Sequence, residues 1–246
     1  MTYSYRAMEL TRIQELLQPF LSGPLTSAQL AQISIYIDLL TRWNARINLT
    51  AIRNPEEIVT RHFGESFFAA RHLYPVDHSG QTAPSRGPEF QPADNEPASA
   101  VRHFENPTGT AKAVDLGSGA GFPGIPLKIW SPGTATILIE SNQKKVAFLR
   151  EVIRALTLTA IDVFAGRAED YPAASASLVT LRAVERFTAV LPIAAQLLAP
   201  QARLALLISQ AQVDQAQRLL TSFQWSHPAP IPQSTSRVLL TGTAPN

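Results

Sequence analysis

The sequence predicts an α/β fold in which a mostly parallel sheet carries helices on both faces, with a helical extension before it. From residue 111 onward, short apolar segments typical of strands alternate with helical segments, as in parallel sheets. Residues 1–74 show the period of amphipathic helices instead. We therefore divide the chain into an N-terminal helical extension (1–74), a proline-rich insert (75–110) and an α/β domain (111–246).

The extension contains two recognisable helix starts. Thr26 and Gln29 have the spacing of a capping box, and an apolar helical stripe follows them. Asn54 can cap a second start, since Pro55 suits the first helical position and the two acidic residues after it suit the positive end of the helix dipole. We expect this second segment to end near Leu73.

Residues 75–110 contain six prolines and three glycines and have almost no apolar periodicity. A segment of this composition cannot bury enough apolar surface to offset its ordering entropy. We therefore expect a flexible insert, which is unusual inside a compact fold.

The α/β domain contains six apolar segments that we interpret as strands, with helices between them. The expected strands are 113–116, 136–139, 160–164, 178–181, 204–208 and 237–241, and the expected helices are 143–156, 188–198 and 213–221. Residues 225–234 are rich in proline and are expected to form a connection.

The composition excludes several function classes. The chain has no cysteine, which removes disulfides, thiolate zinc sites and cysteine nucleophiles. No apolar run approaches the roughly 18–20 residues needed to cross a bilayer, and the N-terminus lacks the apolar core of a signal peptide. A net charge of +2 does not suggest a polybasic nucleic-acid coat. We expect a soluble, cytoplasmic protein.

A glycine-rich loop follows the first strand of the domain. The strand ends at Asp115, and Gly117, Gly119 and Gly121 follow before a helix start. Glycines at these positions let the backbone turn sharply and approach a ligand closely. This arrangement is typical of nucleotide-cofactor sites, although a G-x-G pattern alone is weak evidence.

The next strand ends in Glu140, 23 residues after Gly117. A carboxylate at this position can accept hydrogen bonds from both ribose hydroxyls of a cofactor. The spacing G-x-G-x-G differs from the dinucleotide pattern, and Asp115 is positioned to meet the cationic amino group of a methionine moiety. These features favour S-adenosylmethionine over NAD.

The loop and its neighbours resemble one known family. Residues 114–126, with the distinctive tail Phe122-Pro123-Gly124-Ile125-Pro126, resemble the small-subunit ribosomal RNA guanine-N7 methyltransferases (RsmG, also called GidB). Further blocks follow in the family's order: Arg42-Trp43-Asn44 with Asn48-Leu49-Thr50, Arg61-His62 with Glu65-Ser66, Ile139-Glu140-Ser141 with residues 144–150, Gly166-Arg167-Ala168-Glu169, and Arg182-Ala183. The similarity covers about residues 26–74 and 111–200, and is weaker beyond.

The resemblance implies a Rossmann-like class I methyltransferase with a seven-stranded, mostly parallel sheet. It also implies cofactor contacts from Gly117, Phe122, Ala168, Glu169 and Arg182. Three sites depart from the family pattern, besides the insert: Glu65 replaces the usual Asp, Leu181 precedes Arg182 where Ser is common, and Leu207-Ile208-Ser209 replaces a typical Lys-Gly.

The predicted chemistry is methyl transfer to guanine N7, which carries an in-plane lone pair and needs no general base. The enzyme then mainly aligns donor and acceptor. The sequence lacks the Asn-Pro-Pro-aromatic type of motif used on exocyclic amines. We therefore assign no catalytic residue, and Arg182 is our candidate for positioning the acceptor. Its alternative role is an ion pair with Glu185 or Glu169.

The predicted partner is 16S rRNA or the 30S ribosomal particle, bound by a monomer. Phosphate contacts are expected from basic residues near the cofactor side, namely Arg61, Lys144, Lys145 and Arg150, although each can equally belong to a solvated helix face. No cluster has metal-ligand spacing. The alternatives are a methyltransferase of the same fold acting on a protein or small molecule, a non-catalytic RNA-binding relative and, more distantly, a nicotinamide-dependent oxidoreductase.

Overall fold

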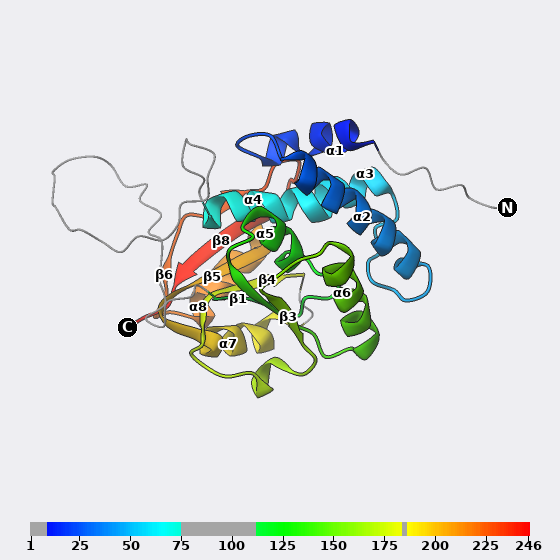
Figure 1. Ribbon diagram of the computed structural model, residues 1–246. Coiled ribbons are helices and arrows are strands. Elements are labelled where there is room, and N and C mark those ends of the chain that lie inside the picture. Colours follow the sequence, from blue (N-terminus) through cyan, green and yellow to red (C-terminus); the bar gives the residue numbers. More distant parts are fainter. Residues whose placement is uncertain (1–8, 75–111, 184–185) are drawn as a thin grey trace, which may run out of the picture.

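The sheet is built around β1 (Lys112–Leu116), which pairs in parallel with both β2 (Ala135–Ile139) and β4 (Ala176–Arg182). The computed structural model describes residues 9–74, 112–183 and 186–246 (Figure 1). Within these residues the strand order is β3-β2-β1-β4-β5-β8-β6, where β3 is Ile161–Phe164, β5 is Leu198–Ser209, β6 is Gln224–Trp225 and β8 is Arg237–Thr243. Strands β1 to β5 are parallel, and β8 is antiparallel to β5. The predicted Rossmann-like sheet is therefore confirmed.

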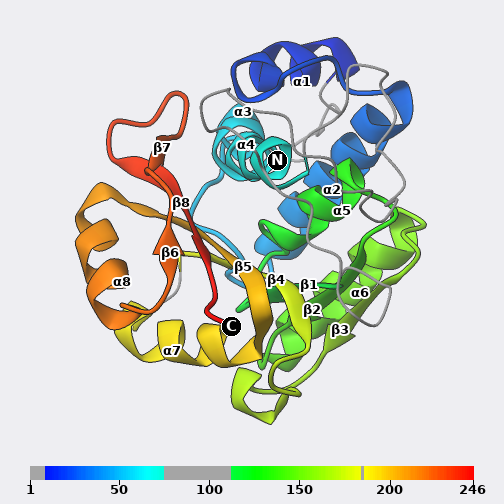
Figure 2. The same ribbon diagram turned by 90° about the vertical axis from the view of Figure 1, so that its left-hand side faces the viewer.

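Helices cover both faces of the sheet, as predicted. One face carries α5 (Gly124–Trp130) and α6 (Gln143–Ala155), and the other carries α7 (Phe187–Leu197) and α8 (Val213–Leu219). Figure 2 shows the two groups on opposite sides of the strands. Each face has its own apolar core, because successive strand residues point to opposite faces.

The N-terminal helices pack on the same face of the sheet as α5 and α6. They are α1 (Leu10–Leu17), α2 (Ser27–Asn44), α3 (Pro55–Glu57), the π-helical segment η2 (Ile58–Gly64) and α4 (Glu65–Leu73). Their apolar residues belong to the same core as those of α5 and α6. The extension is thus packed onto the domain, on the face that Figure 1 shows uppermost.

Both predicted helix starts are confirmed. Thr26 and Gln29 form a capping box at the start of α2, and the Asn54 side chain accepts hydrogen bonds from two backbone N–H groups of α3. The predicted end at Leu73 is also observed, although the path from α3 to α4 includes a π-helical turn. Single π-helical turns within helices are frequent at functional sites.

The sheet differs from the prediction at its last strands. Strand β5 begins at Leu198, not at residue 204, and residues 225–234 contain parts of two short strands, β6 and β7 (Ala229–Pro230), which pair with β8. The described sheet therefore has eight strands, not the seven that were expected. The two-residue strands lack the alternating pattern that identifies longer ones. The predicted insert (75–110) lies outside the described residues, in which no helix is long and apolar enough to cross a membrane.

Candidate cofactor and acceptor site

The direction of the strand order reverses between β1 and β4. The chain moves from β1 to β2 and β3 on one side, then returns to β4 and β5 on the other. Doubly wound sheets bind ligands where the order reverses, outside the carboxyl ends of the strands. In this protein that place lies between β1, which ends at Leu116, and β4, which ends at Arg182.

The glycine loop after β1 has an open half and a packed half. Gly117, Gly119 and Gly121 all adopt positive φ, at 71°, 58° and 87°. A Cβ on Gly117 would meet nothing within 4 Å, and one on Gly119 would meet a backbone oxygen at 3.7 Å. A Cβ on Gly121 would instead lie 2.2 Å from the Tyr36 hydroxyl. The first half of the loop therefore leaves room for a ligand, and the second half is held against α2.

Asp115 holds this loop in place through hydrogen bonds. Its carboxylate is buried and accepts hydrogen bonds from Ser118 Oγ (2.5 Å), Gly124 N (3.1 Å) and Thr180 Oγ1 (2.7 Å). Burial raises the pKa of Asp115, although these three donors oppose the shift. The sequence suggested that Asp115 meets the methionine ammonium group. In the structure its carboxylate holds the loop and contacts β4, and the contact with a methionine ammonium group stays a prediction.

Glu140 lies at the carboxyl end of β2, directly beside the loop. Its two oxygens accept hydrogen bonds from Gly119 N (2.9 Å) and Asn142 N (2.8 Å). A carboxylate next to the open half of a positive-φ glycine loop matches what a ribose diol needs, namely acceptors for two hydroxyls. The residues present therefore fit the adenosine part of S-adenosylmethionine.

Phe122 is enclosed by aromatic rings. Tyr36 from α2 stacks on one side, with ring centroids 5.2 Å apart, and His62 from η2 stacks within 4.7 Å. Phe63 meets the ring edge-on at 5.1 Å, and Phe122 is 6% exposed. The sequence predicted that Phe122 packs near the cofactor. In the structure it anchors the loop tail to the N-terminal helices, and its contact with the cofactor stays a prediction.

His62 connects this aromatic stack to Arg182. Nη1 of Arg182 lies 3.0 Å from Nδ1 of His62, and Nε2 of His62 lies 2.8 Å from Oγ1 of Thr50. A guanidinium only donates, so Nδ1 is the acceptor and Nε2 carries the proton that His62 donates to Thr50. Burial, with smaller contributions from the nearby Arg182, Arg61 and Arg237, lowers the pKa of His62 to about 3. His62 is therefore a neutral link at physiological pH.

Glu65 is the buried centre of an ion cluster. Its carboxylate pairs with Arg61 (Nε to Oε1, 3.2 Å), Arg182 (Nη2 to Oε2, 3.1 Å) and Arg237 (Nη2 to Oε1, 2.6 Å). The Glu65 side chain is 2% exposed. The alternative ion pair of Arg182 with Glu169 is not observed, and Glu185 lies outside the described residues. We call Glu65 and its three arginines the Glu65 cluster.

The Glu65 cluster borders a cavity of about 240 Å³ at the ends of β4 and β5. Apolar side chains also line this cavity, among them Phe187, Leu207 and Ile208. Arg237 reaches this edge because β8 is antiparallel to β5, so its first residue lies opposite the last residue of β5, Ser209. Arg237 thus supplies a cation beside Leu207-Ile208-Ser209, the segment in which the resemblance led us to expect Lys-Gly.

Sequence reasoning did not identify Tyr36, Thr180 and Arg237 as site residues. Of the three, Arg237 could most readily have been predicted, because an antiparallel last strand must begin at the edge where the parallel strands end. Tyr36 reads as an apolar-stripe residue of α2, and its hydroxyl donates to the Ala120 carbonyl only in the folded chain. Thr180 lies within an apolar strand and gives no separate signal.

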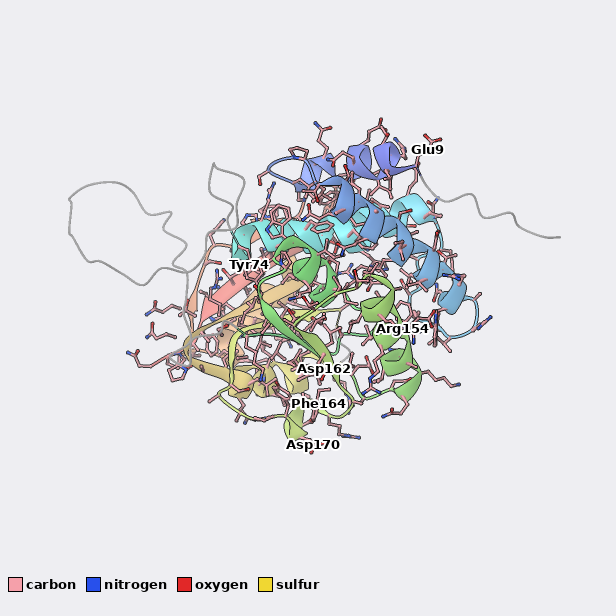
Figure 3. The ribbon with its side chains drawn as sticks, viewed as in Figure 1. Glu9, Tyr74, Arg154, Asp162, Phe164 and Asp170 are labelled. Carbon is pink, nitrogen blue, oxygen red and sulfur yellow. The ribbon has the colours of Figure 1, made fainter. Side chains whose placement is uncertain are left out.

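The other predicted residues lie in the turn after β3 and on α6. Ala168 is buried and begins η3 (Ala168–Asp170), which follows β3, and Glu169 is exposed beside it. Figure 3 shows Phe164, which ends β3, close to Asp170 in this turn. Lys144 and Lys145 lie in the first turn of α6, where Asn142 caps their N–H groups, and Arg150 is exposed on the same helix. These positions leave the predicted cofactor and RNA contacts as predictions.

The chain matches the family described as rRNA small subunit methyltransferase G over residues 29–79 and 96–234. Among its relatives, the ribosomal RNA small subunit methyltransferase G of Chloroflexus aggregans is 36% identical over 73% of this chain and 67% of its own length. The protein of that name from Cupriavidus necator is 30% identical over 82% and 78%. The one from Lachnoclostridium phytofermentans is 36% identical over 59% of this chain and only 47% of its own length. On these matches, the chain belongs to the rRNA small subunit methyltransferase G (GidB) family.

Proposed function

We propose that this chain transfers a methyl group from S-adenosylmethionine to N7 of a guanine in 16S ribosomal RNA. The observation that carries the proposal is the arrangement at the carboxyl ends of β1 and β4. There an open glycine loop has Glu140 beside it, and a cavity lined by arginines and by apolar residues lies at the end of β4. The names of the relatives, which are small-subunit ribosomal RNA methyltransferases, support the choice of substrate.

The cofactor, when bound, supplies an electrophilic methyl group on a sulfonium centre. Glu140 would hold the ribose, and the backbone around Gly117 and Gly119 would lie against the cofactor, because a side chain is absent there. Asp115 keeps this backbone in place through Ser118 and Gly124. Ala168 and Glu169 would flank the adenine from the turn after β3.

Arg182 would orient the acceptor base. Three of its five N–H donors are used by His62, Arg61 and Glu65, which leaves donors for a ligand such as guanine O6. These three contacts also fix the guanidinium in place, and pre-set donors lose little entropy when they bind. Because guanine N7 attacks with its own lone pair, alignment is the main contribution that the protein needs to make.

The test is to incubate labelled S-adenosylmethionine with undermethylated 16S rRNA, assembled 30S particles and bulk cell protein. The proposal expects label in one or both RNA samples, with 7-methylguanosine recovered after digestion. Label in protein alone would support a protein methyltransferase of the same fold instead. Cofactor binding without label in any sample would support a non-catalytic RNA-binding relative. If the ribosome is the substrate, the reaction takes place in the cytoplasm.

A further inference from the structure

The Glu65 cluster carries more positive charge than its own contacts neutralise. Three guanidinium groups surround one carboxylate, and Glu65 is the only acid among the described residues that line the cavity. Glu57 also pairs with Arg61, but at 3.7 Å and with 49% of its side chain exposed, so it neutralises little. His62, beside Arg182, stays neutral. Three cations and one anion leave a net charge of +2 on the cavity wall.

The three arginines differ in what they can still bind. Arg182 is 11% exposed and is held by three partners. Arg237 is 24% exposed, its guanidinium pairs with Glu65 alone, and its buried Nε has no partner within the described residues. Arg61 is 40% exposed and pairs with Glu65 and Glu57. Arg237 and Arg61 therefore have N–H donors available to a ligand that enters the cavity.

The guanidinium groups that line this cavity favour an oxyanion as the ligand. Guanidinium groups bind phosphate oxygens through paired, charge-assisted hydrogen bonds, and desolvated surroundings strengthen them. We propose that the cavity binds a backbone phosphate of the RNA substrate, with Arg237 and Arg61 as its ligands. In the free protein, Glu65 holds these two side chains at the cavity edge. This inference rests on the proposed function for the choice of RNA.

The cavity lies where a bound phosphate could position the RNA substrate. Strand β8 brings Arg237 beside the end of β5, and Arg182 ends β4, next to the glycine loop after β1. His62 joins the two places, since it contacts both Arg182 and the loop residue Phe122. A phosphate bound at Arg237 would therefore hold the RNA backbone near Arg182 and the glycine loop. Phosphate contacts set the register of a nucleic acid without reading its sequence.

The first experiment uses inorganic phosphate. Thermal unfolding of the full chain is followed against phosphate concentration, with chloride at matched ionic strength. We expect phosphate to raise the Tm of the wild type and of R218Q more than that of R237Q. Arg218 is a matched control because it is an exposed arginine on α8 and does not line the cavity. Equal phosphate responses in R237Q and the wild type would overturn the anion site.

The second experiment tests RNA as the source of the phosphate. The affinity for a guanine-containing single-stranded 16S rRNA fragment is measured over a series of salt concentrations. Loss of one phosphate contact should lower the slope of log K against log salt by about 0.7 in R237Q, and leave it unchanged in R218Q. R237K, which keeps the charge, should keep most of the slope while binding more weakly. A phosphate response without a slope change would overturn the RNA assignment.

These experiments distinguish a failure of the phosphate site from a failure of the proposed methyltransferase activity. Normal methylation with an unchanged salt slope in R237Q would reject only the phosphate site. A reduced slope in R237Q together with no methylation of any RNA sample would reject only the proposed activity. Melting curves of R237Q and R237K without phosphate show whether either variant has lost its fold, and R237K carries the slope test if R237Q has.

Discussion

Arg182 donates a hydrogen bond to His62, although both side chains are bases. Nη1 of the arginine lies 3.0 Å from Nδ1 of the histidine, and this contact requires a neutral imidazole. The same ring stacks on Phe122 and donates to Thr50. One residue of the N-terminal extension thus joins the tail of the glycine loop to the end of β4. Several predictions depend on contacts of this kind between the extension and the sheet.

The first prediction concerns the pH dependence of stability. In the unfolded chain His62 titrates near its ordinary pKa of 6.5, but burial and three arginines lower its folded pKa to about 3. Between these values the unfolded state binds more protons, so stability should fall as the pH falls. The H62Q variant lacks this pH-dependent contribution to stability. The stability advantage of the wild type over H62Q should shrink by about 2–4 kcal/mol between roughly pH 7 and pH 4.

Urea unfolding of both proteins across this pH range measures the effect. NMR of the His62 ring provides a direct check, since its shifts should not titrate down to roughly pH 5. Parallel stability curves for wild type and H62Q would contradict a neutral, buried His62.

The second prediction concerns Glu65. Its replacement in E65Q leaves the buried guanidinium of Arg182 without a charged partner. Breaking a buried ion pair in this way typically costs about 3–5 kcal/mol of unfolding free energy. We expect a loss of this size in denaturant unfolding.

The matched control for E65Q is E57Q. Glu57 also pairs with Arg61, but both side chains are largely exposed. Its removal should change the stability by no more than about 0–1 kcal/mol. If E57Q and E65Q were equally stable, the Glu65 cluster would not be a buried, mutually dependent unit.

The third prediction tests the packed half of the glycine loop. A methyl group in G121A would lie 2.2 Å from the Tyr36 hydroxyl, at a φ of 87° that L-residues rarely adopt. In G117A the added methyl group meets open space, so only backbone strain of about 1–2 kcal/mol is expected. G121A should therefore destabilise the protein more than G117A does, as measured by thermal unfolding.

A double variant isolates the clash with Tyr36. Y36F removes the nearest atom that the new methyl group would meet, while Ile125 Cδ1 at 2.7 Å remains, and it also removes the hydrogen bond to the Ala120 carbonyl. The loss caused by G121A should be smaller in the Y36F background than in the wild type. Strict additivity of the two changes would show that Tyr36 and the loop do not meet.

The architecture could be predicted from the sequence because its signals are local. Caps such as Thr26 and Asn54, and the apolar period of each strand, depend on residues close together in the chain. The glycine loop and Glu140 were found for the same reason, since their spacing along the chain reflects one strand-turn-helix unit.

The contacts between distant segments could not be predicted in this way. Glu65 and Arg237 are 172 positions apart and meet only because the extension packs against the end of an antiparallel strand. The same holds for Phe122. Its position in the loop suggested a ligand contact, and only the packing of α2 and η2 shows that other rings enclose it.

The last prediction separates the two carboxylates of the loop. Asp115 accepts three hydrogen bonds in a buried place, and the amide nitrogen of an asparagine cannot accept any of them. D115N should therefore lower the unfolding free energy by about 1–3 kcal/mol, because a buried donor is left unpaired. Glu140 lies at the open half of the loop, so E140Q should weaken S-adenosylmethionine binding by about 1–3 kcal/mol and change stability less.

Calorimetry with S-adenosylmethionine and urea unfolding, applied to both variants, give the comparison. D214N is the control for both, since Asp214 is exposed on α8 and lies outside the loop. The division of roles requires the larger stability loss in D115N and a clear loss of affinity in a well-folded E140Q. An unchanged dissociation constant in E140Q would remove Glu140 from the cofactor site. A D115N protein as stable as D214N would show that the three donors do not depend on the Asp115 carboxylate.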